Sequence, residues 1–358
     1  MSRKVFVHIG APKTGTTYLQ DRLGRNASTL ADHGVHVPAR NAITSPGLSQ
    51  FRAALDLQGQ DWGGPPGHAA GYWDAMARRI RRLDGTVILS HEILAPARPE
   101  HIAKLKADLA GSELHVVYSA RDHGRQLPAA WQESIKQGRR WTYARFCKKV
   151  TRNQPWFARA FDLPTVLGNW SAGLSPDRVH VVTVPHERGG EVLWHRFCDV
   201  FGIDPAWAPL DSDRSNASLG AAETVLLRKL NKRMERGERR SARYDNLIRR
   251  MLAEGTLVQS SSDRITLPPA MQPWAQAEAE RWIEWIEGSG VDVVGDVEDL
   301  RPRPLDPATP YANPDRVRAR AQLKVALDAL AAMTAEAARR PDPDDNLGRK
   351  VKQKLRMP

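Results

Sequence analysis

Four short runs of apolar and β-branched residues recur along the chain, and each is followed by a segment with helical periodicity. The runs cover residues 4–9, 86–90 (TVILS), 114–119 (LHVVYS) and 179–184 (VHVVTV). Strands that alternate with helices along a chain form parallel sheets joined by right-handed crossovers. We therefore predict an α/β fold in which a doubly wound parallel sheet carries helices on both faces.

The remaining segments predict how the rest of the chain is organised. Helical periodicity is expected at residues 16–30, 72–83, 99–110, 126–136, 143–151, 157–170, 194–201, 221–234, 271–287 and 314–339. Residues 38–70 are rich in Pro, Gly and Ser, and we expect a surface excursion or lid with a short helix at 49–57. We predict one domain over residues 1–300, followed over 301–358 by a proline-rich linker, a helix and a basic tail.

Composition limits the function classes without choosing among them. The formal charge of +12 predicts a surface that attracts anions, such as nucleic acid, acidic lipid head groups or a small polyanion. The N-terminus lacks an apolar signal segment and no run of eighteen apolar residues occurs, so we expect a cytoplasmic protein without a transmembrane segment. The two cysteines, Cys147 and Cys198, form no zinc or redox motif, and we expect both to be reduced and packed.

The first strand runs into a glycine loop, Gly10-Ala-Pro-Lys-Thr-Gly15, that opens the next helix. A Walker A loop has the pattern GxxxxGK[ST], with its lysine directly after the last glycine. Here Thr16 stands at that position, and the lysine lies inside the loop as Lys13. Backbone N–H groups and threonine hydroxyls at the helix start still suit a phosphate. The lysine is placed to reach the bridging oxygen between a 5′-phosphate and the group that leaves it.

The stretch PKTGTTYLQ, residues 12–20, resembles the 5′-phosphosulfate loop of sulfotransferases that use 3′-phosphoadenosine-5′-phosphosulfate (PAPS), whose most specific signature is a PKxGTT core. The resemblance covers residues 4–205, is closest to carbohydrate-type and bacterial members, and implies a P-loop NTPase-like sulfotransferase fold. It implies that Lys13 is catalytic, neutralising charge on the bridging oxygen as the sulfuryl group departs. It also implies that Lys13 and residues 14–17 (Thr14, Gly15, Thr16 and Thr17) hold the 5′-phosphate.

The same resemblance implies a second anion site for the ribose 3′-phosphate of PAPS. In the family an arginine just after the third strand and a serine eight residues later hold this phosphate. Arg121 matches the arginine, and Asp122 follows it as in the family, but Ala129 stands at the serine position. The missing contact is expected from Ser119, Arg125 or Gln126.

The family's RKGxxGDWK element, which closes over the nucleotide in cytosolic members, is absent. The stretch RSNASLGAAE at residues 214–223 is a candidate replacement through Arg214, Asn216 and Ser218. A capped helix start uses the same residue types for structural reasons alone.

Sulfuryl transfer to a hydroxyl needs a group that removes the acceptor's proton. In the family this base lies at the end of the second strand, as a histidine or a glutamate. Here His91 and Glu92 are adjacent at that point. Successive strand side chains point to opposite faces, so one of the two is expected to reach the acceptor, with Glu92 favoured.

These observations predict an enzyme that moves a sulfuryl group from PAPS to a hydroxyl, or an amine, of an acceptor and releases adenosine 3′,5′-bisphosphate. No metal is expected, because lysine and backbone amides can meet the charge change at the bridging oxygen. A carbohydrate or glycolipid acceptor is suggested by Glu92; nucleic acid is not expected as a partner, and peripheral membrane contact stays open.

Three alternatives remain: a P-loop kinase or NTPase, a basic nucleic-acid-binding protein, and a protein that binds PAPS without turnover. The first lacks the Walker A lysine at position 16 and a Walker B aspartate. The second lacks a helix-turn-helix, RNA-recognition or zinc motif. The third is kept open by Ala129 and is made less attractive by the presence of Lys13 and Glu92. The identity of the acceptor and the oligomeric state are not predicted.

Overall fold

The computed structural model describes residues 3–41, 43–187, 190–214, 218–260, 262–305, 308 and 310–340. Within these residues, six strands form one sheet of order β2-β3-β1-β4-β5-β6, in which every neighbouring pair is parallel. The strands are β1 Lys4–His8, β2 Val35–His36, β3 Thr86–Ser90, β4 Glu113–Ala120, β5 Val179–Thr183 and β6 Asp292–Val294. The predicted doubly wound parallel sheet is confirmed.

The position of β1 decides where a ligand can bind. The chain builds β2 and β3 on one side of β1 and then crosses to the other side for β4, so strand order reverses at β1. Open parallel sheets bind ligands in the crevice beyond the carboxyl ends of the strands at such a reversal. The glycine loop follows β1 directly and therefore lies at this point.

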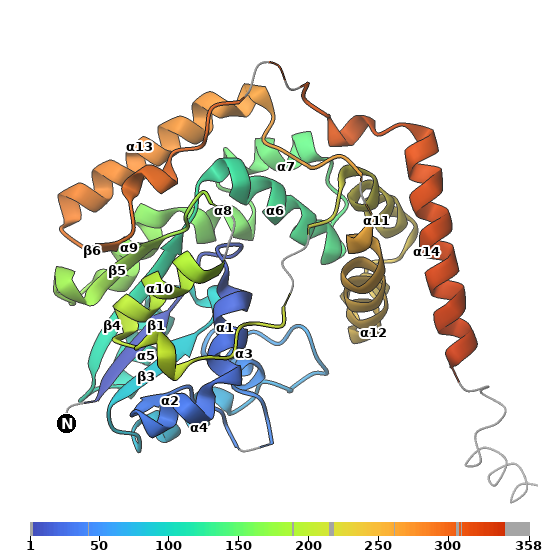
Figure 1. Ribbon diagram of the computed structural model, residues 1–358. Helices are drawn as coiled ribbons and strands as arrows, with labels where there is room; N and C mark the ends of the chain where they lie inside the picture. Colours follow the sequence, from blue (N-terminus) through green and yellow to red (C-terminus); the bar gives the residue numbers. More distant parts are fainter. Residues whose placement is uncertain are drawn as a thin grey trace, which may run out of the picture.

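Helices cover both faces of the sheet, as Figure 1 shows. The first half of the chain supplies α1 Thr16–Arg25, α2 Ala27–Asp32, α3 Pro46–Leu57, α4 Tyr72–Ile80, α5 Pro99–Asp108, α6 His123–Lys136, α7 Tyr143–Val150, α8 Trp156–Phe161 and α9 Leu163–Ser171. The second half supplies α10 Gly190–Phe201, α11 Ala221–Arg233, α12 Ala242–Tyr244, the π-helix η5 Asp245–Thr256, α13 Gln272–Ser289 and α14 Ala319–Arg339. In the view of Figure 1, α13 runs along the top and α11, α12 and α14 lie on the right, away from the sheet.

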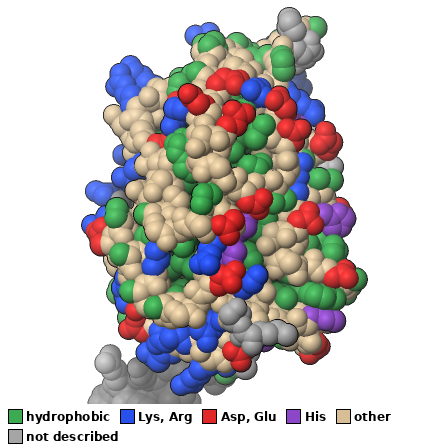
Figure 2. Space-filling model, turned by 90° about the vertical axis from the view of Figure 1, so that its left-hand side faces the viewer, with side chains coloured by type: hydrophobic (Ala, Val, Ile, Leu, Met, Phe, Trp, Pro, Cys, Tyr) green, Lys and Arg blue, Asp and Glu red, His purple; other side chains and the backbone are tan. Residues whose placement is uncertain are grey.

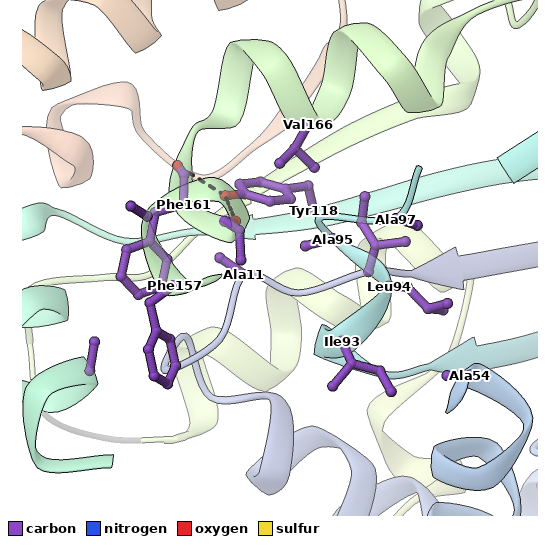
Figure 3. Packing of buried hydrophobic residues seen from close by; sticks show 14 of the residues in the cluster. Ala11, Ala54, Ile93, Leu94, Ala95, Ala97, Tyr118, Phe157, Phe161 and Val166 are labelled. Atoms are coloured by element: carbon purple, nitrogen blue, oxygen red, sulfur yellow. Dashed lines mark hydrogen bonds between the residues drawn. The ribbon is translucent and has the colours of Figure 1, made fainter. Parts of the chain in front are cut away.

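Two apolar cores, one on each face, hold this arrangement together. Alternate residues of β1 point to opposite sides, with Val5 and Val7 in the larger core and Phe6 in the smaller one. Figure 3 shows part of the larger core, where Tyr118 of β4 packs near Val166 and its hydroxyl donates to the carbonyl oxygens of Ala160 at 2.9 Å and Phe161 at 3.3 Å. The strand ends that carry the glycine loop are thus backed by a packed interior.

Two helices that were expected to be continuous are split. The helix expected at 16–30 breaks at Asn26, whose side chain donates to the carbonyl oxygens of Arg22 and Leu210. The helix expected at 157–170 breaks at Asp162, and Pro164 then occupies the first turn of α9, where its missing N–H is tolerated. The strands β2 and β6 were not expected, because two or three residues carry no readable strand alternation. The π-helix was also not expected.

Residues 38–70 combine a packed helix with an exposed loop. On α3 the residues Ser49, Gln50, Ala53 and Leu55 are buried. The Gln50 side chain donates to the carbonyl oxygen of Ile88 at 3.2 Å and accepts from the amide of Ser90 at 2.8 Å. The loop that follows α3, in which Trp62 is exposed, borders the cleft described below.

The described part of the chain after residue 300 ends in α14, which packs against α11 and η5 through the buried residues Val325 and Ala329. Figure 2 shows acidic, basic and apolar side chains interspersed over most of one face, with several basic side chains together near its lower edge. Among the described residues, no helix combines the length and apolarity needed to cross a membrane.

Candidate functional site

The carboxyl ends of β3, β1 and β4 open into a cleft of about 2940 Å³. Its lining includes the glycine loop, the His91–Glu92 pair after β3 and Arg121 after β4. The opposite wall comes from the C-terminal half of the chain, including Arg249 and Arg264. Pockets for one small ligand usually measure roughly 300–1,000 Å³, so this cleft has room for two substrates.

The glycine loop has a strained, well-supported backbone. Gly10, Lys13 and Gly15 all adopt positive φ, at 98°, 67° and 94°. Lys13 is a non-glycine residue in the left-handed region, which costs about 1 kcal/mol or more and persists only where neighbours enforce it. Here Arg121 donates to the Lys13 carbonyl oxygen at 2.9 Å, and Gln126 donates to the Pro12 carbonyl oxygen at 3.1 Å.

The start of α1 offers unused hydrogen-bond donors to the cleft. Within the described residues, the amide N–H groups of Gly15, Thr16 and Thr17 donate to no protein acceptor, and the Thr16 and Thr17 hydroxyls make no side-chain hydrogen bond. The helix dipole adds positive potential at the same place. This end of α1 therefore suits an anionic group such as a phosphate.

The side chains of Thr14 and Ser119 are buried beneath the loop, and of the two only Thr14 is among the residues that line the cleft. The Thr14 hydroxyl donates to the Ala11 carbonyl oxygen at 2.5 Å and lies 2.5 Å from the Ser119 hydroxyl. Ser119 in turn lies 3.1 Å from Nε2 of His8, whose Nδ1 lies 2.8 Å from the Ser90 hydroxyl. Burial lowers the pKa of His8 to about 3, so the chain of hydrogen bonds is neutral. These side chains shape the loop from below.

Lys13 extends toward α6 and forms an ion pair with Glu133, Nζ to Oε2 2.8 Å. Glu133 is only 5% exposed and is also contacted by Arg249 at 2.9 Å and Lys136 at 3.5 Å. Sequence reasoning missed Glu133 and Arg249. The one available signal was a glutamate among the apolar positions of the helix that follows Arg121, in the stretch AAWQESI.

Glu92 lies beside the glycine loop. A Cβ placed on Gly10 would lie 2.9 Å from Cβ of Glu92, so glycine permits this close approach. Burial raises the pKa of Glu92, but His91, a backbone hydrogen bond, Lys13 and a hydrogen bond from Gln20 outweigh it, and the pKa lies below its usual range. Glu92 is therefore a carboxylate at neutral pH.

His91 lines the cleft next to Glu92, and its ring packs at a tilt against Phe51, with ring centroids 5.1 Å apart. Its Nδ1 accepts from the amide of Ile93 at 3.3 Å. Burial lowers the pKa of His91, and the nearby Glu92 carboxylate opposes this only in part. A neutral imidazole that accepts through Nδ1 carries its proton on Nε2.

The expected 3′-phosphate residues separate into two groups. Arg121 lines the cleft, its Nε is buried without a partner, and its pKa is lowered to about 10, first by burial and then by Arg125 and Arg264. Arg125 also lines the cleft, but its guanidinium pairs with Asp122 and donates to the carbonyl oxygens of Val184 and Pro185. Gln126 is fully buried against the loop.

Several further residues line the cleft. Ala129 lines the cleft and supplies no polar group. Arg264, which sequence reasoning missed, lines the cleft close enough to Arg121 to lower its pKa. Arg214 and Ser218 line the cleft, and Asn216 lies outside the described residues. In the part of the chain that the structure describes, no three His, Cys, Asp or Glu side chains are grouped to hold a metal ion.

Comparisons with known proteins return little. No protein-family model matches the sequence, and no curated protein matches it. A crystal structure of a sulfotransferase from Alicyclobacillus acidocaldarius aligns with 69% of this chain and 96% of that one, at 12% sequence identity and a TM-score of 0.37.

Proposed function

We propose that this protein transfers a sulfuryl group from PAPS to a hydroxyl group of an acceptor. The observation that carries the proposal is the juxtaposition, at the ends of adjacent parallel strands, of a lysine-bearing anion loop after β1, an arginine with an unpartnered Nε after β4, and a carboxylate after β3. The lysine loop would stabilise the leaving group, the arginine would bind the second phosphate, and the carboxylate would remove the proton of the acceptor.

The loop provides the 5′ end of the donor site. The free amides of residues 15–17 and the hydroxyls of Thr16 and Thr17 are arranged to bind a 5′-phosphate at the start of α1. Lys13 projects from the same loop and can neutralise charge that develops on the bridging oxygen. Such stabilisation of developing charge is usually the largest single contribution to catalysis.

Arg121 and Arg264 support a site for the ribose 3′-phosphate. Burial, then Arg125 and to a smaller extent Arg264, lower the pKa of Arg121, and a dianionic phosphate bound by Arg121 and Arg264 would offset the repulsion between these cations. The buried Nε of Arg121 lacks a hydrogen-bond partner, and an oxygen of the 3′-phosphate would supply one. Arg264 would thereby provide the contact that Ala129 cannot.

Glu92 is the better candidate for the base. It is ionised at neutral pH and can accept the acceptor's proton, whereas Nε2 of His91 already carries one. His91 would donate to the acceptor instead. We propose a carbohydrate or glycolipid hydroxyl as the acceptor, because Phe51 and the half-exposed Trp62 offer aromatic surface on this side of the cleft.

Calorimetric titration with adenosine 3′,5′-bisphosphate and with ADP tests the proposal. We expect the bisphosphate to bind at least tenfold more tightly than ADP, and Arg264→Gln to remove most of that preference, since a charged hydrogen bond contributes about 1.5–3 kcal/mol. Arg78→Gln, on the exposed face of α4, is the matched control and should keep the preference. Equal affinity of the unmodified protein for both nucleotides would contradict the proposed function.

A further inference from the structure

Glu133 joins the two walls of the cleft through opposite charges. Its Oε2 lies 2.8 Å from Nζ of Lys13 on the glycine loop, and its Oε1 lies 2.9 Å from the guanidinium of Arg249 on the π-helix η5. Lys136, one turn further along α6, lies 3.5 Å away. Three cations therefore surround one buried carboxylate.

This excess of cations has a physical consequence. Burying an unpaired carboxylate costs several kcal/mol, so a buried glutamate with a single partner would hold that partner firmly. Burial raises the pKa of Glu133, but Lys13, Arg249 and Lys136 hold it well below its usual range. If Lys13 leaves, Arg249 and Lys136 still compensate the carboxylate. Releasing Lys13 therefore does not leave a buried carboxylate unpaired, as it would if Lys13 were the single partner of Glu133.

The element that carries Arg249, η5, is a π-helix that borders the cleft. Helices of this type are rare and occur frequently at functional sites. Twelve residues of η5 adopt it, and Arg249, Arg250 and Glu254 from this element line the cleft. Arg249 also approaches Asp245 at 3.5 Å and Glu254 at 3.6 Å, so its guanidinium is held toward Glu133 by its own element.

We infer that Glu133 is a positioning residue that holds Lys13 in a resting position across the cleft, and that the 5′-phosphate end of the donor replaces Glu133 as the partner of Lys13. This inference rests on the proposed function. After the exchange, Glu133 stays paired with Arg249 and Lys136 and keeps the π-helix anchored to α6. Glu133 thus competes with the ligand for one amine, and it lowers donor affinity through Lys13 alone.

A double-mutant cycle on adenosine 3′,5′-bisphosphate binding tests this competition. We expect Glu133→Gln to tighten binding about tenfold, equivalent to about 1.4 kcal/mol. In a Lys13→Met background the same substitution should change affinity less than twofold. Glu254→Gln removes a carboxylate from the same cleft that does not contact Lys13, and it should shift affinity by equal factors in both backgrounds.

Glu133→Asp tests whether the contact with Lys13 or the negative charge alone matters. It also provides a second variant in case Glu133→Gln does not fold. The shorter side chain keeps the negative charge but withdraws it from Lys13, so binding should again tighten several-fold in the protein with Lys13 only. Tightening that is equal with and without Lys13, or no tightening in either Glu133 variant, would overturn the inference. Failure of the proposed function has a different signature, because the unmodified protein would then bind the bisphosphate no better than ADP.

Discussion

At the scale of single residues, Lys13 combines two properties. Its backbone adopts a left-handed conformation, and its amine is paired with a buried carboxylate at the edge of a large cleft. The backbone conformation places the side chain inside the loop rather than at the start of α1, where a Walker A lysine would lie. A Walker A lysine stands directly after the last glycine of its loop, so the position of Lys13 differs from that pattern.

Replacing Lys13 by alanine should therefore separate turnover from binding. Alanine tolerates the left-handed backbone no worse than lysine, and Glu133 keeps Arg249 and Lys136 as partners, so we expect the fold to persist. The single-turnover release of adenosine 3′,5′-bisphosphate from PAPS, with water as the acceptor of the sulfuryl group, should fall by about 10²–10³, because the lost interaction is with charge that develops in the transition state.

The affinity of Lys13→Ala for adenosine 3′,5′-bisphosphate, measured by calorimetry, should change by less than about tenfold, since the loop amides remain and a competing ion pair is lost with the amine. A fall in affinity as large as the fall in rate would show that Lys13 binds the ground state and the transition state equally.

At the scale of elements, the sequence predicted the four strands at the centre of the sheet to within one or two residues. Their continuous apolar runs are those of strands buried on both faces. The edge strands β2 and β6 were missed because they are two and three residues long. Helix breaks at Asn26 and Asp162 depend on local contacts, and the former uses Leu210, far along the chain.

The residues of the candidate site likewise fall into those that the sequence predicted and those that it did not. The loop, His91, Glu92 and Arg121 follow strand ends directly, so a correct strand assignment brings them to one edge. Arg249 and Arg264 come from a region with no strand periodicity, and only tertiary packing places them in the cleft. The same holds for two partners of Glu133, because Lys13 lies 120 residues before it in the loop and Arg249 lies in the later π-helix.

The shape of the glycine loop depends on a position where the residue has no Cβ. Gly10 has a φ of 98°, and a Cβ there would lie 2.9 Å from Cβ and 3.0 Å from Cα of Glu92. We expect Gly10→Ala to lower the free energy of unfolding by about 2–4 kcal/mol, from left-handed strain and overpacking together. It should also weaken nucleotide binding by displacing Glu92 and the loop.

Gly24→Ala is the matched control for Gly10→Ala. Gly24 lies within α1, and a Cβ there would meet no atom within 4 Å, so alanine should stabilise the protein by about 0.5–1 kcal/mol. Urea unfolding of both variants measures the difference. Similar stability of the two variants would mean that the close approach between the loop and Glu92 is not a constraint on the fold.

At the scale of the whole molecule, one buried histidine ties the centre of the sheet to the loop. His8 of β1 lies between Ser90 of β3 and Ser119 of β4, and Ser119 supports Thr14. Burial lowers its pKa from 6.5 to about 3. The unfolded chain therefore binds a proton between these pH values that the folded protein does not, and stability from this residue is present above pH 6.5 and is lost progressively as pH falls toward 3.

This linkage predicts how a substitution at His8 changes the pH dependence of unfolding. Glutamine retains hydrogen-bonding groups but does not titrate, so His8→Gln should cost stability at pH 7 through imperfect packing. As pH falls from 6 to 4.5, the stability advantage of the unmodified protein over the variant should shrink by about 1.4 kcal/mol per pH unit. Urea unfolding at constant ionic strength measures both proteins. Parallel curves for His8→Gln would instead mean that His8 takes up its proton in the folded sheet.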